Sequence, residues 1–589
     1  MEKWVEVPKH VNTESIAQKH GISPIVAEIL LNRNIEESEM DAFLSPGPKS
    51  FHDPFMLNGM EWVVCLLNEK ISASEKIRII GDYDVDGICA TYILFRGLSF
   101  FGADADYDIP HRIEDGYGIN EKLIRTAKSA GRSVIITCDN GISAANEVDL
   151  AHELNMTVIV TDHHEPPYEE VDGVKNYKLP KADALTDPKI PDDEYTFKGI
   201  CGAFLALKVI EAYAKRFKVP VSEEFRKLIL ELTEFAALAT VCDVMELRDE
   251  NRALVTMGMR YMERSRNLGL KALINETGLS GKKISPYHLG FVIGPCLNAS
   301  GRLDTSLRAL SLFVERNPQS AKEKAADLKA LNESRKAMTL EWSEKAFKEV
   351  ESREKPDKVL VLYLKGCHES LAGIIAGKVR ERFVRPTFVL TDAENGLKGS
   401  GRSIEAYDMH AGLVKADPLL TKYGGHRLAA GVSLEPEKLE AFIKNLNDNC
   451  NLTEEDFSET VYIDAVLEPE NATMALAREI DRLSPYGVGN ETPLFLAKDL
   501  TIVSGNRMGK NANVGKYKVV SQNGSVCEMI FFGDLEVFED YISKKYSKET
   551  GEKLHSGQNI SVKLDLCFNL GINTYMGRDK VQLTIKHFR

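Results

Sequence analysis

The sequence predicts an α/β protein that combines a parallel-sheet domain, a long connecting helix, a smaller α/β domain and a C-terminal β-barrel. Three features predict this order. Between residues 76 and 164, short β-branched runs alternate with helix-like segments. Residues 321–351 are rich in Ala, Leu, Lys and Glu and contain neither Gly nor Pro. After residue 451, spaced strand-like runs are separated by turn signals.

These features also set the expected domain boundaries. We expect an N-terminal segment over 1–60, the parallel-sheet domain over 61–317, the connecting helix over 318–355, the smaller α/β domain over 356–452 and the barrel over 453–589.

The parallel sheet is predicted from three runs that alternate with helices. The runs are IRII (77–80), SVIIT (133–137) and TVIVT (157–161). The helices are an apolar one over 88–101 and two amphipathic ones over 118–130 and 143–155. This βαβ order predicts a doubly wound sheet with its strands parallel.

The smaller domain and the barrel have their own strand signals. Strands are expected at 358–364 and 386–391, with a helix at 371–383 between them. The C-terminal runs, such as KYKVVS and VQLTIKHF, fit a small antiparallel barrel.

Composition restricts the class of protein. The 589 residues are 43% hydrophobic and 28% charged, which excludes a disordered or fibrous chain. The net charge of −14 argues against indiscriminate coating of nucleic acid but allows a local basic groove. The 10 cysteines never form C-x-x-C, so we expect reduced thiols. No apolar run reaches the roughly 18 residues of a membrane span, so we expect a cytoplasmic protein without a membrane partner.

Acidic residues and histidines follow the predicted strands directly. Because the carboxyl ends of parallel strands share one edge of a sheet, these side chains should converge in one crevice. A further aspartate ends the apolar run FAALATVC (235–242). The residues are Asp82, Asp84 and Asp86 after the first run, Asp139 after the second, Asp162, His163 and His164 after the third, and Asp243.

Convergent carboxylates need a cation, because they cannot all stay ionised side by side without one. Oxygen ligands with one or two imidazoles suit Mn²⁺ or Mg²⁺, and the histidines favour Mn²⁺. Several acidic contributions make two ions about 3.5–4 Å apart plausible. Such a pair generates hydroxide near neutral pH and stabilises an in-line displacement at phosphorus, so phosphoester hydrolysis is the favoured chemistry.

Each motif alone has a simpler interpretation. A DxDxDG sequence is often a calcium-type loop or a turn, and Asp-His-His can be a capping aspartate with two exposed histidines. Three strand ends that all carry metal-type ligands make the simpler interpretation improbable.

Six motifs in order resemble those of the DHH phosphoesterases, and among them the single-strand-specific exonucleases. They are GDYDVDG (81–87), CDNGIS (138–143), TDHHEP (161–166), TVCD (240–243), IGPCLNASGRL (293–303) and YGGHRLAAG (423–431). The resemblance covers nearly the whole chain, so 61–317 corresponds to the DHH catalytic domain and 356–452 to the DHH-associated domain.

The resemblance implies a metal-dependent exonuclease that degrades single-stranded DNA from 5′ to 3′ into mononucleotides in recombination and repair. It implies single-stranded DNA as the substrate, with a helicase and a single-strand-binding protein as candidate partners. Carried over by position, the metal ligands are Asp82, Asp84, Asp86, Asp139, His163, His164 and Asp243. Six of them, all except Asp86, are also the expected catalytic residues, and Asp162 is placed near the metals rather than on them.

Several residues are candidates for binding the substrate. His111 and Arg112 lie in a loop after a predicted strand, where a guanidinium could hold a phosphate. Asn298 and Arg302 lie in what we take as a Gly-containing turn. The segment KGSGRS (398–403) has the composition of a phosphate cradle. It contributes Ser400, Arg402 and Ser403, and His368 and His426 are expected to face the same cleft.

The chain departs from the family pattern at two positions. Cys296 stands where the family usually has an arginine before LNA, and Cys367 precedes His368 where a tryptophan is common. The loss of a guanidinium puts substrate preference in question more than catalysis.

The predicted barrel resembles an oligonucleotide-binding fold, in which basic and aromatic side chains hold single strands. The candidates are Arg507, Lys510, Lys516, Tyr517, Lys518, Phe568, Tyr575 and Arg578. Aromatic residues in short strands are more often part of the core.

Two alternative functions remain at this point. One is a phosphodiesterase for short oligonucleotides or cyclic dinucleotides, which would not need the barrel. The other is a non-catalytic replication scaffold, against which the intact set of acidic residues and histidines argues.

Overall fold

The structure is a computed structural model that describes residues 2–8, 10, 12–171, 174–509, 511–575 and 577–589, with only the backbone at Tyr575. The chain forms two compact units. The first contains His52–Met245 and Leu254–Glu459, and the second contains Glu2–Phe51, Glu246–Ala253 and Thr460–Arg589. Among the described helices, none combines the length and the apolar character that a bilayer crossing requires.

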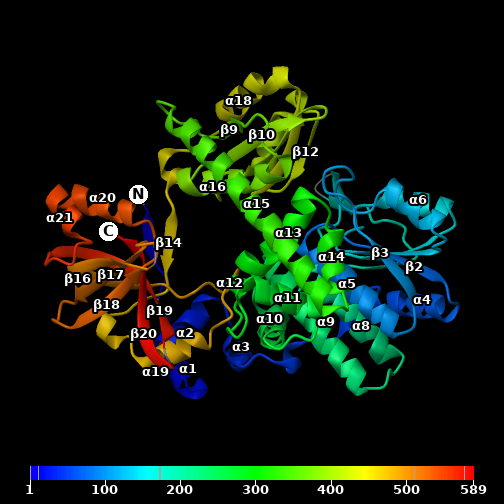
Figure 1. Ribbon diagram of the computed structural model, residues 1–589, viewed down its shortest axis with the longest axis horizontal. Helices are drawn as coiled ribbons and strands as arrows, with labels where there is room; N and C mark the ends of the chain where they lie inside the picture. The colour runs from blue at the N-terminus through cyan, green and yellow to red at the C-terminus, as the bar shows by residue number, and fades with distance from the viewer. Residues whose placement is uncertain (1, 9, 11, 172–173, 510, 576) are drawn as a thin grey trace. The chain divides into compact units, whose positions relative to one another are not determined.

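The first unit contains a five-stranded sheet in the order β3-β2-β4-β5-β8, of which β2 and β3 are labelled in Figure 1. All of its strands are parallel, as the sequence predicts. The strands are β2 (Lys76–Ile80), β3 (Asp104–Asp108), β4 (Val134–Cys138), β5 (Thr157–Thr161) and β8 (Ala184–Thr186).

Helices cover both faces of this sheet. On one face, α5 (Val85–Phe100) and α8 (Gly202–Arg216) pack against the central strands. On the other, α6 (Glu121–Ser129) and α7 (Ala145–Glu153) bury their apolar stripes in a core with β4 and β5. The predicted doubly wound arrangement is therefore confirmed.

Further helices complete the DHH-like part of this unit. They are α4 (Met60–Ser72), α9 (Glu223–Cys242), α11 (Leu268–Glu276), α12 (Pro286–His288), α13 (Gly294–Leu303), α14 (Leu307–Phe313) and α15 (Pro318–Glu351). Helix α10 (Asp249–Met262) begins in the second unit and ends in the first. The helix α15 has 34 residues and confirms the predicted connector. A π-helical segment, η4 (Leu289–Ile293), precedes α13.

The predicted turn at Asn298 and Arg302 is wrong, because both residues lie within helix α13. The glycine that suggested a turn has another role. A Cβ at Gly301 would overlap Ser306 Oγ and would lie 2.9 Å from the carbonyl oxygen of Tyr83. The glycine therefore lets the helix approach the GDYDVDG loop closely.

The smaller domain contains a mixed sheet in the order β12-β13-β11-β10-β9. Only β9 and β10 are parallel. The elements are β9 (Leu360–Tyr363), η5 (Glu369–Leu371), α16 (Ala372–Phe383), β10 (Thr387–Ala393), β11 (Gly396–Arg402), β12 (Lys422–Gly425) and β13 (Ala429–Leu434).

The segment KGSGRS forms most of strand β11 rather than a phosphate-binding loop. Its glycines allow close packing inside this domain. A Cβ at Gly399 would overlap the carbonyl oxygen of Val389, and one at Gly401 would overlap Met409 Sδ.

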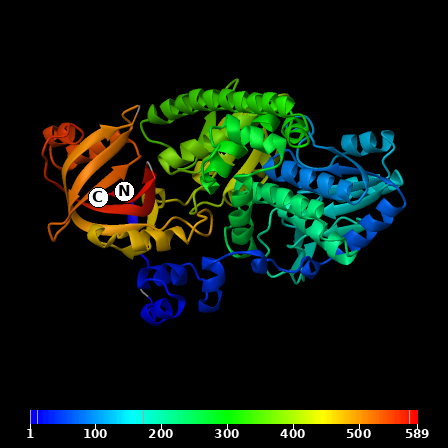
Figure 2. The ribbon, with the colours of Figure 1, turned by 60° about the horizontal axis from the view of Figure 1, so that its bottom comes forward.

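The second unit contains a closed barrel, whose strands are orange to red in Figure 2. The strand order is β16-β17-β18-β20-β19, and β19 pairs back with β16. The strands are β16 (Phe495–Met508), β17 (Val514–Val520), β18 (Val526–Phe531), β19 (Val562–Tyr575) and β20 (Arg578–Phe588).

The barrel differs from the expected antiparallel one in a single pairing, because β18 and β20 are parallel. Helices α20 (Leu535–Lys545) and α21 (Lys548–Lys553) connect β18 to β19. This crossover returns the chain so that the β19–β20 hairpin inserts beside β18.

Candidate active site

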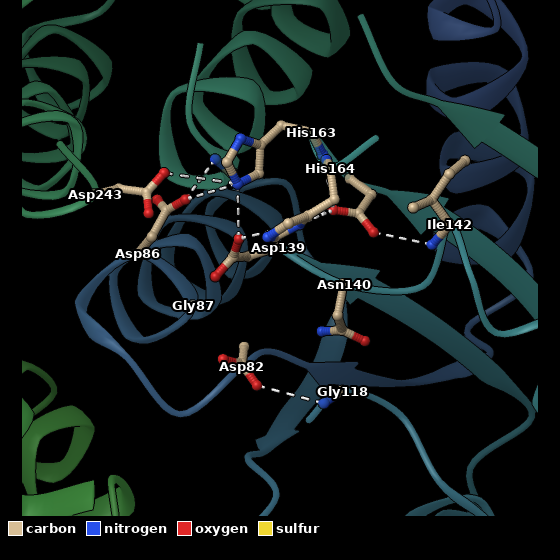
Figure 3. A network of polar contacts seen from close by, with 12 residues as sticks. Asp82, Asp86, Gly87, Gly118, Asp139, Asn140, Ile142, His163, His164 and Asp243 are labelled. Atoms are coloured by element: carbon tan, nitrogen blue, oxygen red, sulfur yellow. Dashed lines mark hydrogen bonds and ion pairs between the residues drawn. The ribbon is translucent and has the colours of Figure 1, made fainter. Parts of the chain in front are cut away.

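The predicted acidic residues and histidines converge at the carboxyl edge of the parallel sheet (Figure 3). His163, which follows β5, lies at the centre. Its Nε2 atom is 3.0 Å from Asp139 Oδ1, 3.4 Å from Asp86 Oδ2 and 3.8 Å from Asp243 Oδ2. Asp139 follows β4, Asp86 lies in α5 and Asp243 follows α9, so the fold joins segments that are distant in sequence.

Two helix N-termini fix the carboxylates of the GDYDVDG loop. Asp84 caps α5 and accepts hydrogen bonds from the N–H groups of Asp86 and Gly87, at 2.9 and 3.2 Å. The Asp86 carboxylate accepts from the N–H groups of Gly202 and Ala203 at the start of α8, at 2.6 and 2.8 Å. The loop is therefore anchored before any ion binds.

Glycines permit this close approach. A Cβ at Gly87 would overlap the backbone of Asp82, and one at Gly202 would lie 2.6 Å from Asp139 Cβ. Asp139 itself has a φ of 62°, a left-handed conformation that aspartate tolerates better than most residues.

Asp162 orients the histidines instead of facing the centre of the cluster. Its carboxylate accepts from the N–H groups of Ile142 and His163, at 2.9 and 2.8 Å. It also lies 2.8 Å from Nδ1 of His164. Burial alone would raise its pKa, but the hydrogen bond and charge of His164 lower the pKa of Asp162 below its usual value.

Three overlapping groups of side chains could each hold a metal ion. Within each group, the donor atoms lie within 4.8 Å of one another. Asp139 and His163 each belong to two groups, which is compatible with two ions that share a ligand. The groups are Asp139–His163–His164, Asp86–His163–Asp243 and Asp82–Asp84–Asp139, and together they contain all seven residues that the sequence nominated.

The protonation of these groups supports a cation site. Burial, followed by repulsion from neighbouring carboxylates, raises the pKa of Asp82, Asp84 and Asp139. The same causes raise the pKa of Asp243 to about 9. Burial lowers the pKa of His163 to about 4, so its ring is neutral, and among the described residues its buried Nδ1 has no hydrogen-bond partner. Such a donor set fits Mn²⁺ or Mg²⁺.

A cavity of about 540 Å³ adjoins the acidic cluster. Tyr83, from the GDYDVDG loop, lines it together with Arg112, Arg302 and Arg402. In the part of the chain that the structure describes, these three arginines have no carboxylate within ion-pair distance. Burial, then repulsion from Arg112, lowers the pKa of Arg302 to about 9. This concentration of positive charge suits a phosphate.

Of the other predicted substrate-binding residues, only Ser400 also lines the cavity. The other predicted residues do not line this cavity, although His368 contacts Ser370, which does. The Nδ1 of His111 accepts from the N–H of Glu114, that of His368 lies 2.8 Å from Ser370 Oγ, and Ser403 Oγ donates to the carbonyl of Tyr407. His426 is exposed between β12 and β13, and Asn298 is half-buried on α13.

Sequence reasoning missed residues whose type gives no motif. Tyr117 Oη donates to the carbonyl oxygen of Asp139 at 2.9 Å and lies 3.1 Å from His164 Nδ1. The guanidinium of Arg112 lies 4.5 Å from the ring centre of Tyr83. Tyr83 lies inside the GDYDVDG motif and Tyr117 lies a few residues after Arg112, but neither tyrosine has a sequence signal of its own.

The predicted stacking surface of the barrel is wrong for two aromatic residues. Tyr517 and Phe568 are fully buried in the barrel core. Arg507 and Lys516 form ion pairs with Glu539 and Glu528. Lys518 and Arg578 are exposed, whereas Lys510 and the side chain of Tyr575 lie outside the described residues.

Comparison with known families gives three matches in chain order. The DHH family N-terminal domain matches residues 76–239, the DHHA1 domain matches 357–452 and the RecJ OB domain matches 463–587.

Curated relatives cover most of the chain. The single-stranded-DNA-specific exonuclease RecJ of Bacillus subtilis is 32% identical over 591 residues, which cover 99% of this chain and 70% of that protein. The RecJ of Escherichia coli is 30% identical over 512 residues, which cover 84% of this chain and 87% of that protein.

Solved structures share the fold. The structure of RecJ from Thermus thermophilus in complex with Mn²⁺ superimposes with a TM-score of 0.79 at 24% identity, covering 100% of this chain and 79% of that one. A structure of exonuclease RecJ bound to manganese gives a TM-score of 0.58 at 30% identity, covering 68% of this chain and 96% of that one.

A parallel sheet with this donor set at its edge, followed by a DHHA1 domain, defines the class of DHH phosphoesterases. Within this class, the terminal barrel and the 32% identity to a RecJ protein over 99% of this chain identify the family. The chain belongs to the RecJ family.

Proposed function

We propose that this protein is a metal-dependent exonuclease that degrades single-stranded DNA from 5′ to 3′ into mononucleotides in recombination and repair. The observation that carries the proposal is the metal-type donor set beside an arginine-lined cavity, in a chain of the RecJ family. Its relatives are named single-stranded-DNA-specific exonucleases.

The proposed metal ligands are the seven residues of the three donor groups. When bound, two Mn²⁺ or Mg²⁺ ions would activate water and neutralise charge on the phosphate under attack. The chain itself keeps His163 neutral by burial and holds His164 in place through Asp162. His163 is therefore available as a ligand and does not compete as a cation.

The cavity supports cleavage at a strand end. Tyr83 lies between Asp82 and Asp84 in sequence and lines the cavity, so a phosphate held there adjoins the acidic cluster. We propose that Arg112, Arg302 and Arg402 hold a terminal 5′-phosphate, which would leave the next phosphodiester at the metal ligands.

The rest of the proposal concerns the whole chain. The barrel would hold the strand beyond the active site, and a helicase and a single-strand-binding protein would supply it. We propose a cytoplasmic location, where such DNA is processed. We also retain the division at residues 60, 317, 355 and 452 as the proposed domain boundaries.

A labelled DNA strand tests the proposal. A long single strand, labelled at either end and with or without a 5′-phosphate, would be incubated with Mn²⁺, Mg²⁺ or chelator. We expect mononucleotides from the 5′ end only when metal is present, and no hydrolysis by Asp139→Ala or His163→Ala protein that remains folded. Cleavage of a dinucleotide with survival of the long strand would instead support the short-oligonucleotide phosphodiesterase.

A further inference from the structure

Cys296 occupies the contact between helices α13 and α15. Its thiol donates to the carbonyl oxygen of Val292 at 3.2 Å. The amide Nδ2 of Asn332, on α15, donates to the sulfur at 3.4 Å. The cysteine therefore fixes the orientation of a side chain on the neighbouring helix.

Asn332 passes this orientation on to Arg335. Its Oδ1 accepts from Nε and Nη2 of Arg335, at 3.1 and 3.0 Å. Asn332 is only 3% exposed, and both its amide nitrogen and its amide oxygen are hydrogen-bonded, so the side chain has little freedom to rotate. Asn332 therefore connects Cys296 to the guanidinium of Arg335 and fixes the position of that guanidinium.

Arg335 has donors left for an anion. Two of its five N–H groups point to Asn332, and in the described part of the chain no carboxylate lies within ion-pair distance of it. The side chain is half-buried. A half-buried arginine that has spare N–H donors and no carboxylate beside it can bind an external anion.

The position of Arg335 relates it to the arginine-lined cavity. Helix α15 packs against both α13 and α16, which carry cavity residues such as Arg302 and Gly373. After burial and Arg112, Arg335 is the next cause that lowers the pKa of Arg302. The two guanidinium groups are thus close enough to repel each other.

We infer that Arg335 is a substrate-binding residue, which holds a backbone phosphate of the strand next to the one in the arginine-lined cavity, and that Cys296 and Asn332 position it. The family pattern has an arginine at position 296. In this chain Arg335, on α15, supplies a guanidinium in its place. This inference rests on the proposed function and adds a residue to its binding surface.

Binding without catalysis tests the inference. The probe is a 5′-phosphorylated single-stranded DNA of 20 nucleotides with a 3′ fluorophore, titrated in chelator at several KCl concentrations. We expect Arg335→Ala to raise Kd about tenfold and to reduce the slope of log Kd against log salt by about 0.7, the loss of one phosphate contact. Lys322→Ala, which removes an exposed charge from the same helix, is the matched control and should change neither the Kd nor the slope appreciably.

A second set of variants tests the role of Cys296. Cys296→Arg in the Arg335→Ala protein should restore most of the affinity and the salt slope. Cys296→Val, which cannot accept from Asn332, should weaken binding severalfold, whereas Cys296→Ser should not. Arg335→Lys, which keeps the charge without the planar fork, serves if the alanine variant fails to fold.

The outcomes separate the two claims. If Arg335→Ala and Lys322→Ala proteins bind the strand with the same Kd and salt slope as the wild type, the inference is overturned. If the wild-type protein neither binds this strand in chelator nor hydrolyses it with metal, the proposed function itself fails.

Discussion

At the scale of the residue, Asp162 shows how a side chain outside the cluster controls it. Its carboxylate accepts hydrogen bonds from the N–H groups of Ile142 and His163 and lies 2.8 Å from Nδ1 of His164. We expect Asp162→Asn to weaken Mn²⁺ binding by about 10–100-fold, because the ring of His164 loses the charge that orients it. Calorimetric titration of the metal measures this. Glu153→Gln, at the exposed end of α7, is the control, and unchanged Mn²⁺ affinity of the Asp162 variant would refute the role.

The acidic cluster also predicts the pH dependence of stability without metal. Asp243 has a pKa of about 9 in the folded protein against an ordinary value of 3.8. Between these values the folded state keeps a proton that the unfolded state has lost, so stability falls as pH rises. His163, with a pKa lowered from 6.5 to about 4, acts in the opposite sense only below about pH 6.5.

We therefore expect the Tm measured in chelator to decrease as the pH rises from about 7 to 9. In this range the raised pKa of Asp243 lowers stability with pH, and the opposite contribution of His163 is absent. Added Mn²⁺ should raise the Tm most at the upper end of this range, because protons no longer compete for the ligands. Asp243→Asn should reduce the fall, and the part that remains includes His164. Burial alone would lower the pKa of His164, but the hydrogen bond and charge of Asp162 outweigh this effect and raise that pKa to about 9. A metal-free Tm that rises with pH over this range would contradict the assignment.

The residue scale also shows what sequence can predict. The seven metal-type residues could be nominated because each follows a buried run whose end is visible in the sequence. Tyr117 and Asn332 could not, since their roles depend on contacts with residues that are distant in the chain. Tyr517 was misassigned because alternation alone does not say which face of a strand is inside.

At the scale of the element, glycines decide how closely the site can be assembled. A Cβ at Gly202 would lie 2.6 Å from Asp139 Cβ. We expect Gly202→Ala to destabilise the protein by about 1–3 kcal/mol and to weaken metal binding, because helix α8 must move away from the cluster. Gly571→Ala is the control, since a Cβ there meets no atom within 4 Å. Thermal unfolding with and without Mn²⁺ compares the two, and equal Tm values would contradict the packing argument.

The elements differ in how well the sequence predicted them. The strands β2, β4 and β5 were found because buried parallel strands are continuous apolar runs. The sequence predicts a turn where helix α13 lies, because Gly301 serves a tertiary contact that no local pattern reveals. The parallel β18–β20 pair was missed for a similar reason, since strand order is set by the crossover through α20 and α21.

At the scale of the whole molecule, the second unit is assembled from three separate segments of the chain. Arg252, in the middle segment, is only 1% exposed and joins the other two. It donates to the carbonyl of Phe43 at 2.9 Å and to those of Leu483 and Ser484, each at 2.8 Å. Its guanidinium also lies 3.9 Å from the ring centre of Phe43. No sequence pattern marks this arginine, because all of its partners are far away in the chain.

This arrangement predicts that the second unit can be weakened without altering the metal site. Arg252→Met would leave several buried carbonyl groups without donors, so we expect a loss of about 3–5 kcal/mol in the stability of that unit. Differential scanning calorimetry should show a transition that moves to lower temperature and does not respond to Mn²⁺. A second transition, from the unit with the acidic cluster, should keep its shift with Mn²⁺. If the variant lost Mn²⁺ affinity as well as stability, Arg252 would support the active site in addition to the barrel unit.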